Sequence, residues 1–219
     1  MTGKKKAILF FTILCAVIIL FTASFRFAAL DEGFHKSEFR KYGVYSQFPK
    51  EDIEKINKDV LDYLTNKKSS IDNSFFNQKE LSHLADVKKI FSSFFLFFYC
   101  SIFVFVFLFI VLAIYDKNTL GNISIVLIGG GIISIIASAI LLLTVLFGFD
   151  SFFTGFHLVF FKPDTWVFGA GDKITTLYTW DFFYDITFRA IVTLLVIAKI
   201  SVVSGFLMKK YLNNRQKIG

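Results

Sequence analysis

The chain has 219 residues, of which 55% are hydrophobic and 31 are phenylalanine, and its formal net charge is +7. A water-soluble domain of this length has no use for so much apolar surface, and the two cysteines both fall within apolar runs, so they offer no disulfide framework. Four runs are long enough to cross about 30 Å of hydrocarbon as helices. They cover about residues 7–29, 90–114, 123–149 and 186–207. The sequence therefore predicts an all-α integral membrane protein with one membrane domain over residues 1–219.

The first run follows three lysines, an arrangement that also occurs in cleaved signal peptides. Its apolar stretch is too long for the hydrophobic region of a typical signal peptide, and no small-residue cleavage site follows it cleanly. Lipid attachment at Cys15 is disfavoured because Leu14 is too large for the position before the modified cysteine. We therefore expect this run to be a retained transmembrane helix.

The distribution of lysine and arginine predicts the orientation. Three lysines precede the first run, Lys117 lies between the second and third runs, and four basic residues follow the fourth. The longer loop 150–185 holds only Lys162 and Lys173 against five aspartates. The positive-inside rule then places both termini in the cytoplasm and segments 30–89 and 150–185 outside it. The positive charge is attributed to this asymmetry and to anionic lipid, not to a nucleic-acid partner.

The first outer segment, residues 30–89, is expected to form a helical cap. Pro49 followed by acidic residues is typical of a helix start. Apolar residues then recur at helical spacing and give the helix one apolar face, which we expect to rest on the membrane surface or on the other outer loop. They are Ile53, Ile56, Val60, Leu61 and Leu64.

The stretch NQKELSHLADVKK, residues 77–89, precedes the second apolar run. Asn77 and Glu80 have the spacing of a capping box, so a helix is expected to begin here and to continue unbroken into the membrane. His83 then lies seven residues, or about 10 Å, above the hydrocarbon edge, which is headgroup depth. Asp86 shares its helix face, where the carboxylate could orient the imidazole or raise its basicity.

The second outer loop, residues 150–185, is rich in aromatic residues around His157 and Trp166, as in a membrane-interface belt. His157 is therefore also expected at headgroup depth. In the preceding run Gly130, Ser134 and Ser138 form a stripe of small residues suited to close helix packing.

Other polar residues have simpler interpretations. His35, with charged residues around it, is expected to be solvated. Arg26 and Arg189, at the outer ends of the first and fourth helices, either extend toward the interface or hold a lipid phosphate or a substrate carbonyl. Lys199, inside the fourth helix, is expected to extend toward the cytoplasm. Taken by themselves, His83 and His157 could also be interfacial residues that satisfy local hydrogen bonds.

Several kinds of chemistry lack their motifs. No HExxH motif, cysteine cluster or acidic ligand group indicates a metal site, and no phosphate-binding loop or GxSxG motif is present. No cofactor is therefore expected. Thiols buried in hydrocarbon are poor nucleophiles, so an enzyme built on this chain would depend on acid–base groups at the outer leaflet.

Three blocks of the sequence resemble those of the lipoprotein intramolecular transacylases: YGVYSQFPKEDIEKINKDVLDYL, FFNQKELSHLADVK and GFHLVFFKPDTWVF. The resemblance covers essentially the whole chain, including four helices and a large first outer loop. It implies that His83 and His157 are the paired histidines of the family, with Asp86 and Trp166 at motif positions. A proline expected before the paired phenylalanines is Thr179 here, which leaves a diverged substrate open.

The resemblance implies transfer of the sn-2 acyl chain of a diacylglyceryl lipoprotein to the α-amino group of the same cysteine, giving a lyso-form lipoprotein. The partners would be that substrate and membrane lipids, and the oligomeric state is open. Either histidine could be the base. The alternative is a non-enzymatic membrane scaffold or lipid-binding protein with a docking cap. A shared active site requires the two histidine side chains to lie in direct or one-water contact, and a separation beyond about 10 Å would argue against it.

Overall fold

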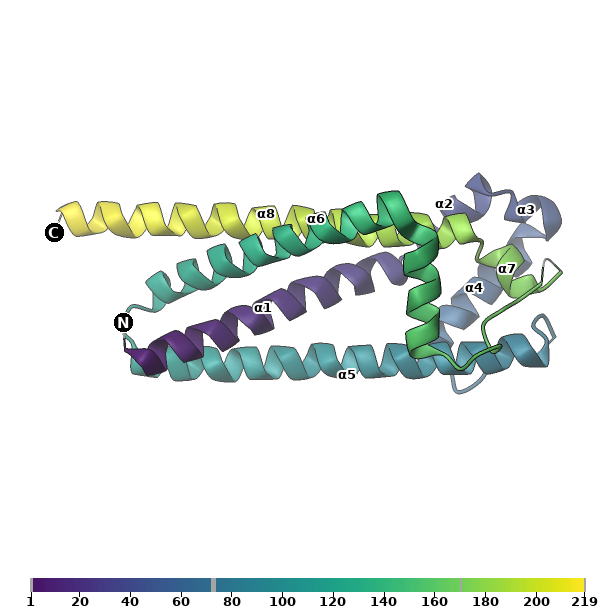
Figure 1. The fold of residues 1–219 in the computed structure, drawn as a ribbon, viewed down its shortest axis with the longest axis horizontal. Helices are drawn as coiled ribbons and strands as arrows, with labels where there is room; N and C mark the ends of the chain where they lie inside the picture. The colour runs from purple at the N-terminus through teal and green to yellow at the C-terminus, as the bar shows by residue number, and fades with distance from the viewer. Residues whose placement is uncertain (1, 72–73, 170, 219) are drawn as a thin grey trace. The chain divides into compact units, whose positions relative to one another are not determined.

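The computed structural model describes residues 2–71, 74–169 and 171–218, and every secondary-structure element in these ranges is a helix (Figure 1). The elements are α1 (Gly3–Ala29), α2 (Glu32–Lys41), α3 (Val44–Gln47), α4 (Lys50–Leu64), α5 (Gln78–Tyr115), α6 (Thr119–Phe160), α7 (Lys173–Leu177) and α8 (Trp180–Ile218). Four of them, α1, α5, α6 and α8, are long and apolar enough to cross a membrane. The predicted all-α fold with four spanning helices is confirmed.

The spanning helices are longer than their apolar runs. Helix α5 has 38 residues, or about 57 Å at 1.5 Å per residue. This is nearly twice the roughly 30 Å of hydrocarbon that a spanning helix must cross. The apolar run of α5 begins at Ile90, so the polar first turns from Gln78 extend beyond it. The predicted continuous helix from the capping box into the apolar run is confirmed.

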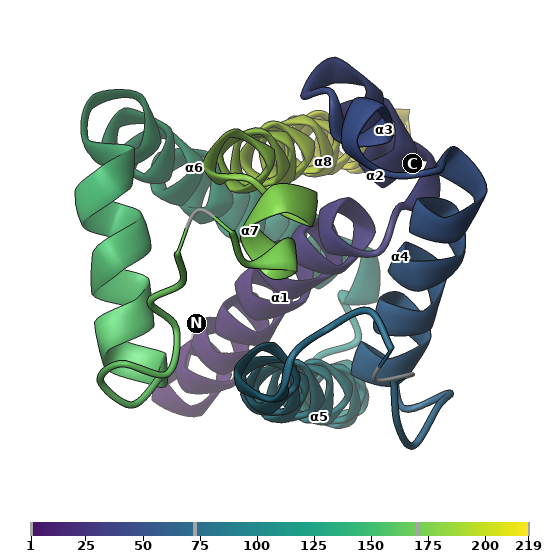
Figure 2. The same cartoon turned by 90° about the vertical axis from the view of Figure 1, so that its right-hand side faces the viewer.

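Helix α6 extends further than the sequence predicted. A loop was expected from Asp150, but the chain stays helical to Phe160 after a non-helical residue at Gly148. The helix changes direction there, as Figure 1 and Figure 2 both show. The residues after Gly148 therefore form a separate helical segment that carries His157.

Helix α8 begins at Trp180, six residues before the predicted apolar run. The hydroxyl of Thr179 accepts a hydrogen bond from the Phe182 backbone N–H at 3.1 Å, which is the bond of a helix N-cap. Thr179 is the residue at which the resemblance led us to expect a proline. A proline side chain has no hydroxyl to accept this bond, so Thr179 caps α8 in a way that proline could not.

The chain divides into two compact units. The first comprises Met1–Arg26, Leu96–Leu142 and Ala190–Gly219. Within it α6 lies close to α8 at Gly131. A Cβ atom at this position would lie 2.8 Å from the Ala198 carbonyl oxygen, which is closer than normal van der Waals contact. The predicted stripe is also buried, since Ser134 and Ser138 are each 1% exposed. Gly131, which the stripe did not include, lies against α8.

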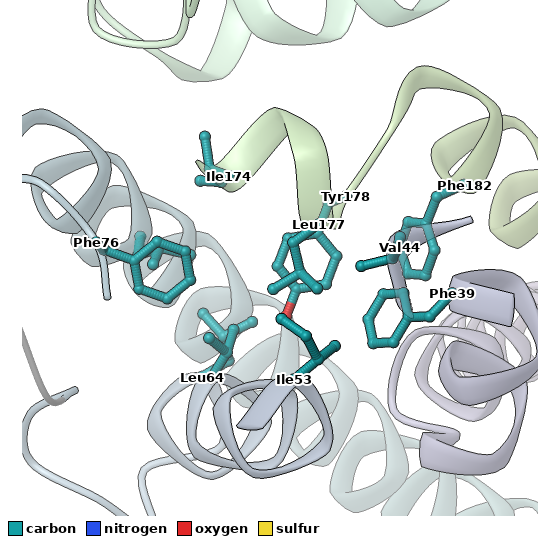
Figure 3. Packing of buried hydrophobic residues seen from close by; sticks show 11 residues of the cluster. Phe39, Val44, Ile53, Leu64, Phe76, Ile174, Leu177, Tyr178 and Phe182 are labelled. Atoms are coloured by element: carbon teal, nitrogen blue, oxygen red, sulfur yellow. The ribbon is translucent and has the colours of Figure 1, made fainter. Parts of the chain in front are cut away.

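The second unit comprises Phe27–Phe95 and Leu143–Arg189, and its core joins the cap to the second outer loop (Figure 3). The apolar face of α4 packs against α7, which belongs to the second outer loop. Of the two predicted partners for this face, the membrane surface and the outer loop, the structure therefore supports the outer loop. Burying one such aliphatic or aromatic side chain contributes about 1.5–3 kcal/mol, so this core is the main stabilising feature of the cap. Its buried members are Phe39, Val44, Ile53, Val60, Leu64, Phe76, Leu84, Ile174, Leu177, Tyr178 and Phe182.

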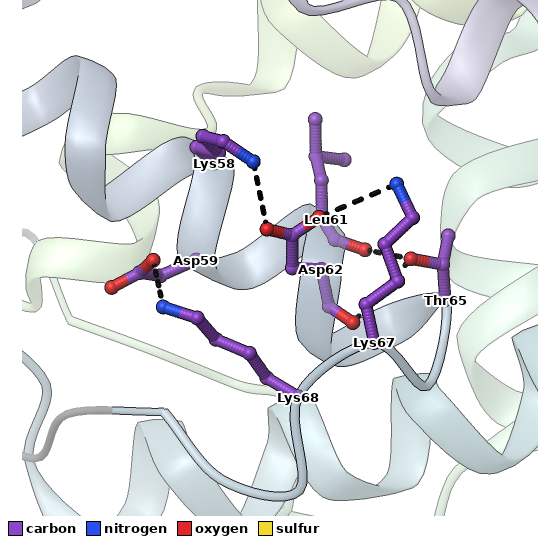
Figure 4. A network of polar contacts seen from close by, with 7 residues as sticks. All are labelled: Lys58, Asp59, Leu61, Asp62, Thr65, Lys67 and Lys68. Atoms are coloured by element: carbon purple, nitrogen blue, oxygen red, sulfur yellow. Dashed lines mark hydrogen bonds and ion pairs between the residues drawn. The ribbon is translucent and has the colours of Figure 1, made fainter.

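The opposite face of α4 carries ion pairs. The Asp62 carboxylate forms ion pairs with Lys58 at 2.8 Å and with Lys67 at 3.5 Å, and Asp59 pairs with Lys68 (Figure 4). All three lysines are strongly exposed. Exposed pairs of this kind contribute little to stability, so they mark a solvated surface.

His35 contradicts the prediction of a solvated residue. Its side chain is 3% exposed, with Nδ1 2.9 Å from the side-chain oxygen of Asn57 and Nε2 3.1 Å from the carbonyl oxygen of Ala29. The charges that surround His35 in sequence lie largely on other faces of α2, while His35 and Phe39 share the buried face. Burial lowers the pKa of His35 despite these two hydrogen bonds.

The burial of His35 predicts a pH-dependent stability. Because the pKa of His35 is lowered on folding, the unfolded chain binds more protons, and stability is lost as the pH falls below the ordinary value of about 6.5. The thermal midpoint of the wild type in detergent should decrease from pH 7.5 to pH 5.5 more steeply than that of His35→Gln, which has no titrating group at this position. Equal slopes for the two proteins would contradict the prediction.

Candidate active site

The start of α5 is held by a reciprocal cap that also fixes His83. The Glu80 backbone N–H donates to the Asn77 side-chain oxygen at 3.0 Å, and the Glu80 carboxylate accepts from the Asn77 N–H at 2.6 Å. The predicted capping box is confirmed. The second carboxylate oxygen accepts from the Ile174 N–H at 2.8 Å, so Glu80, 1% exposed, also ties α7 to α5. His83 lies one turn further along the same helix face.

Replacing Glu80 with alanine is expected to destabilise this unit. The change leaves two backbone N–H groups without their acceptor and should lower the free energy of unfolding by about 2–4 kcal/mol. For a chain of this length that corresponds to a thermal midpoint lower by about 4–16 °C. The control is Glu54→Ala, which removes ion pairs with the exposed Lys36 and Lys50 and a 3.4 Å hydrogen bond from the Tyr45 hydroxyl, and should change the midpoint much less. Equal midpoints for both variants would contradict the assigned role of Glu80.

The two histidines that the sequence singled out lie close together within the second unit. The ring centroids of His83 and His157 are 6.3 Å apart and the rings are nearly parallel, at 17°. Each side chain is only 8% exposed. The separation is below the limit of about 10 Å set for a shared site, although no direct hydrogen bond joins the two rings in the described part of the chain. Convergence of the histidine pair is confirmed.

The hydrogen bond to His157 defines its tautomer. Nδ1 lies 2.7 Å from the carbonyl oxygen of Phe153, one turn earlier in α6. A carbonyl oxygen can only accept, so Nδ1 carries the hydrogen and donates it. The neutral ring then has its lone pair on Nε2, for which the described residues provide no hydrogen-bond partner. In this tautomer Nε2 is the nitrogen of His157 that can accept a proton.

His83 has a different environment. Its Nδ1 is buried and has no hydrogen-bond partner among the described residues. A buried polar atom left unpaired costs about 1–3 kcal/mol, and such atoms often mark functional sites. Rings of Phe161 and Phe168 lie against His83, with centroids at 4.7 and 5.3 Å.

Aromatic residues also surround His157. The Phe153 and Trp166 rings lie 4.2 and 4.6 Å from it, and Phe161 stacks on it at 5.2 Å. The structure thus brings Trp166 to the site, as its motif position implied. Phe161 contacts both histidines but was not singled out in the sequence. Its signal was the four-residue spacing Phe153–His157–Phe161, which places these residues on one face of a helix.

Asp86 does not orient His83 through a hydrogen bond, although its negative charge acts to raise the basicity of the imidazole. The Asp86 carboxylate pairs with Lys89 at 2.8 Å, and neither ring nitrogen of His83 donates a hydrogen bond to it in the described part of the chain. Both partners are three residues away on α5, and a charged ammonium attracts the carboxylate more strongly than a neutral imidazole does.

Arg189 forms an internal ion pair through one guanidinium nitrogen, while its Nη1 is buried and has no hydrogen-bond partner among the described residues. It donates to Asp31, and its guanidinium lies over the rings of Phe27 and Phe34, 5.1 and 4.3 Å from their centroids. Partial burial acts to raise the pKa of Asp31, but the Arg189 bond and the Phe34 backbone N–H outweigh it and lower the value. The ion pair connects the start of α2 with α8.

Arg26 and both cysteines belong to the other compact unit. Arg26 lies 3.4 Å from the Tyr99 hydroxyl, to which it donates. Cys15 and Cys100 are free thiols on α1 and α5. Neither thiol belongs to the unit that contains His83 and His157.

Comparisons with known proteins agree with this arrangement. The family model of the lipoprotein intramolecular transacylase Lit matches residues 10–183. A protein of Aquifex aeolicus, described as uncharacterized, is 26% identical over 140 residues. The match covers 64% of this chain and 61% of that relative, so the chain spans less than two thirds of the relative's length.

Solved structures show the same fold. The membrane-integral lipoprotein intramolecular transacylase Lit from Bacillus cereus has a TM-score of 0.84 at 18% identity, with 100% of both chains covered. A variant of it with a histidine-to-alanine substitution has a TM-score of 0.80 at 18% identity, covering 99% of this chain and 96% of that one. With four apolar helices and this fold, the chain is a multi-pass membrane protein. The match over residues 10–183 shows that it belongs to the lipoprotein intramolecular transacylase family.

Proposed function

We propose that this protein transfers the sn-2 acyl chain of a diacylglyceryl lipoprotein to the α-amino group of the lipoprotein's own N-terminal cysteine. The observation that carries the proposal is the convergence of His83 and His157, 6.3 Å apart, in a chain of the transacylase family. A scaffold or lipid-binding protein would have no reason to bring two buried imidazoles together.

The reaction requires no acyl-enzyme. The amine nitrogen attacks the ester carbonyl carbon and forms a tetrahedral oxyanion, and the nitrogen gives up a proton. The carbon–oxygen bond to the glyceryl sn-2 oxygen then breaks, and that oxygen takes a proton to become a hydroxyl. Because the amine and the ester belong to one molecule, proximity provides the nucleophile. Both free cysteines lie within apolar helices, where a thiol is a poor nucleophile, and this favours direct attack by the amine.

The hydrogen bonds of the two histidines support a division of roles within this proposal. His157 carries its hydrogen on Nδ1, so Nε2 is the atom that accepts the amine proton. His83 is the partner that supplies a proton to the departing alkoxide or donates a hydrogen bond to the oxyanion. Its unpaired Nδ1 leaves it free of a fixed protein partner in the resting state.

The other candidates have smaller roles in this proposal. Trp166 lies against His157, and its effect is considered below. Asp86 acts at most through its charge, because its carboxylate pairs with Lys89. Arg189 maintains the cap through Asp31, while Arg26 remains a candidate contact for lipid phosphate.

The proposed orientation places both termini in the cytoplasm and the histidine pair at the outer leaflet, where mature lipoproteins are anchored by their acyl chains. It predicts the labelling of single cysteines introduced into a Cys15→Ala, Cys100→Ala background. A membrane-impermeant maleimide should label Lys67→Cys in intact cells but Asn214→Cys only after permeabilisation. Labelling of Asn214→Cys in intact cells would overturn the orientation.

The function is tested by expressing the protein in a bacterium whose lipoproteins carry a diacylglyceryl group and a free amine. Intramolecular transfer is an isomerisation, so the mass of the N-terminal lipopeptide stays the same while its fragment ions show an N-linked chain. An unchanged fragment pattern would contradict the proposal. A mass increased by one acyl chain would instead indicate transfer from a second lipid.

A further inference from the structure

His157 is positioned as a base without a carboxylate behind it. Its Nδ1–H donates to the uncharged Phe153 carbonyl at 2.7 Å. When Nε2 takes a proton, the ring becomes a cation in a site from which water is largely excluded, since the side chain is 8% exposed. Placing a charge in such a site is costly unless nearby groups stabilise it. A neighbouring group that attracts a cation would therefore lower this cost.

Charged groups near His157 do not fill that role. His83, on α5, would add a like charge if it were protonated, and the other ionisable groups of the neighbouring elements are engaged or exposed. Lys79 donates to the Val167 carbonyl, the Glu80 carboxylate bonds backbone N–H groups, and Asp86 pairs with Lys89. Asp150 of α6 accepts from Trp180, and Asp172 accepts from Asn77 and Gly169. Lys162 and Asp164 lie in exposed positions after α6.

What faces His157 instead is aromatic surface. The Trp166 ring centroid lies 4.6 Å from that of His157, with 33° between the ring planes, and Phe161 stacks on it at 5.2 Å and 24°. Both separations are within the 6 Å at which a cation is attracted to a ring face, and tryptophan is the strongest partner of this kind. The attraction applies to the protonated imidazole and much less to the neutral ring.

We propose that Trp166 is a positioning residue that stabilises the protonated form of His157 through its ring face, in place of the carboxylate that commonly supports a catalytic histidine. The inference rests on the proposed function for its role in catalysis, but the effect on His157 is a property of the protein itself. In this role Trp166, which occupies a motif position, does not need to contact the substrate.

The composition of the chain allows a direct test, because it contains only two tryptophans, Trp166 and Trp180. In a Trp180→Phe background, fluorinated tryptophans with one, two or three ring fluorines replace Trp166 alone. Fluorine weakens the negative potential of the ring face while changing its size little. The matched control is Trp166→Phe, in which the same amino acids enter only at position 180.

The first readout is the titration of His157 by NMR of isotopically labelled histidine, which requires no turnover. Only three histidines need assignment, and His35→Gln and His83→Gln identify the other two. The titration midpoint of His157 should move to lower pH with each added fluorine, and it should not move with fluorination in the control. An unchanged midpoint across the series would overturn the inference, whether or not the protein is a transacylase.

The second readout is the kinetics of acyl transfer. Loss of the cation–ring attraction should lower kcat by about 3- to 30-fold across the series and leave KM nearly unchanged. Trp166→Phe should retain more activity than Trp166→Leu, because it keeps a ring face. A series that raises KM at constant kcat would instead assign Trp166 to substrate binding and overturn the inference. If no variant or wild type transfers acyl chains while the midpoint still responds, only the proposed function fails.

Discussion

Replacing His157 with asparagine is expected to lower the rate of lyso-form product formation by about 10²–10⁴-fold, the contribution typical of a general base. The amide of asparagine can form hydrogen bonds, but it cannot take up the amine proton that Nε2 of His157 is positioned to accept. His157→Ala should lose activity to the same extent. Purified variants in detergent or lipid can be assayed with a synthetic diacylglyceryl lipopeptide, with fragment-ion mass spectrometry of the product.

The cysteine variants provide the control for this result. Cys15→Ala and Cys100→Ala should retain most of the activity, because a thiol within an apolar helix is a poor nucleophile. Loss of transfer in a correctly folded Cys100→Ala protein would point to an acyl-enzyme and away from direct attack by the amine. Near-normal transfer by His157→Asn would show that His157 is not the general base.

The second large effect is expected at His83. Its ring lies beside His157, and its loss removes either the proton for the departing alkoxide or a donor to the oxyanion, each of which contributes about 10²-fold or more. We expect both His83→Ala and His83→Asn to lose transfer, since the amide cannot carry a proton between groups. His83→Asn with near-normal activity would restrict His83 to hydrogen bonding and contradict its role in proton transfer.

The parts of this structure that the sequence predicted are those controlled by local rules. Apolar runs of about 20 residues correspond to spanning helices. The capping box of Asn77 and Glu80 starts α5 where expected, because its hydrogen bonds join residues only three apart. An unbroken helix then fixes the depth of His83. The second bond of Glu80, to Ile174, was not predictable, since it joins residues 94 positions apart.

The helix beyond Gly148 was missed because most of its side chains are apolar or aromatic. A predominantly apolar segment weakens the 3.6-residue period that identifies a helix, and aromatic residues are also common in interfacial loops. The spacing of Phe149, Phe153, His157 and Phe161 by four residues was the available signal, and successive rings of this series are in contact. This segment places His157 next to His83, and its Phe153 carbonyl determines the tautomer of His157.

The misjudged polar residues share a physical cause. His35 was assigned to solvent from its charged neighbours in sequence, but a helix separates adjacent residues onto different faces. Asp86 had two partners at three-residue spacing, His83 and Lys89, and pairs with the charged one. Spacing along a helix defines which side chains can meet, whereas burial and charge, which depend on the tertiary structure, decide which of them do.

The central claim, histidine-catalysed transfer within one lipoprotein, is tested most directly by a crossover measurement with purified protein. Two diacylglyceryl lipopeptides are mixed, one with an unlabelled peptide and unlabelled sn-2 chain, the other with a heavy peptide and a deuterated sn-2 chain. The account predicts that wild-type protein places the deuterated chain only on the amine of the heavy peptide, and that His157→Asn places it on neither. Deuterated chains on the light peptide, or transfer by His157→Asn at the wild-type rate, would contradict it.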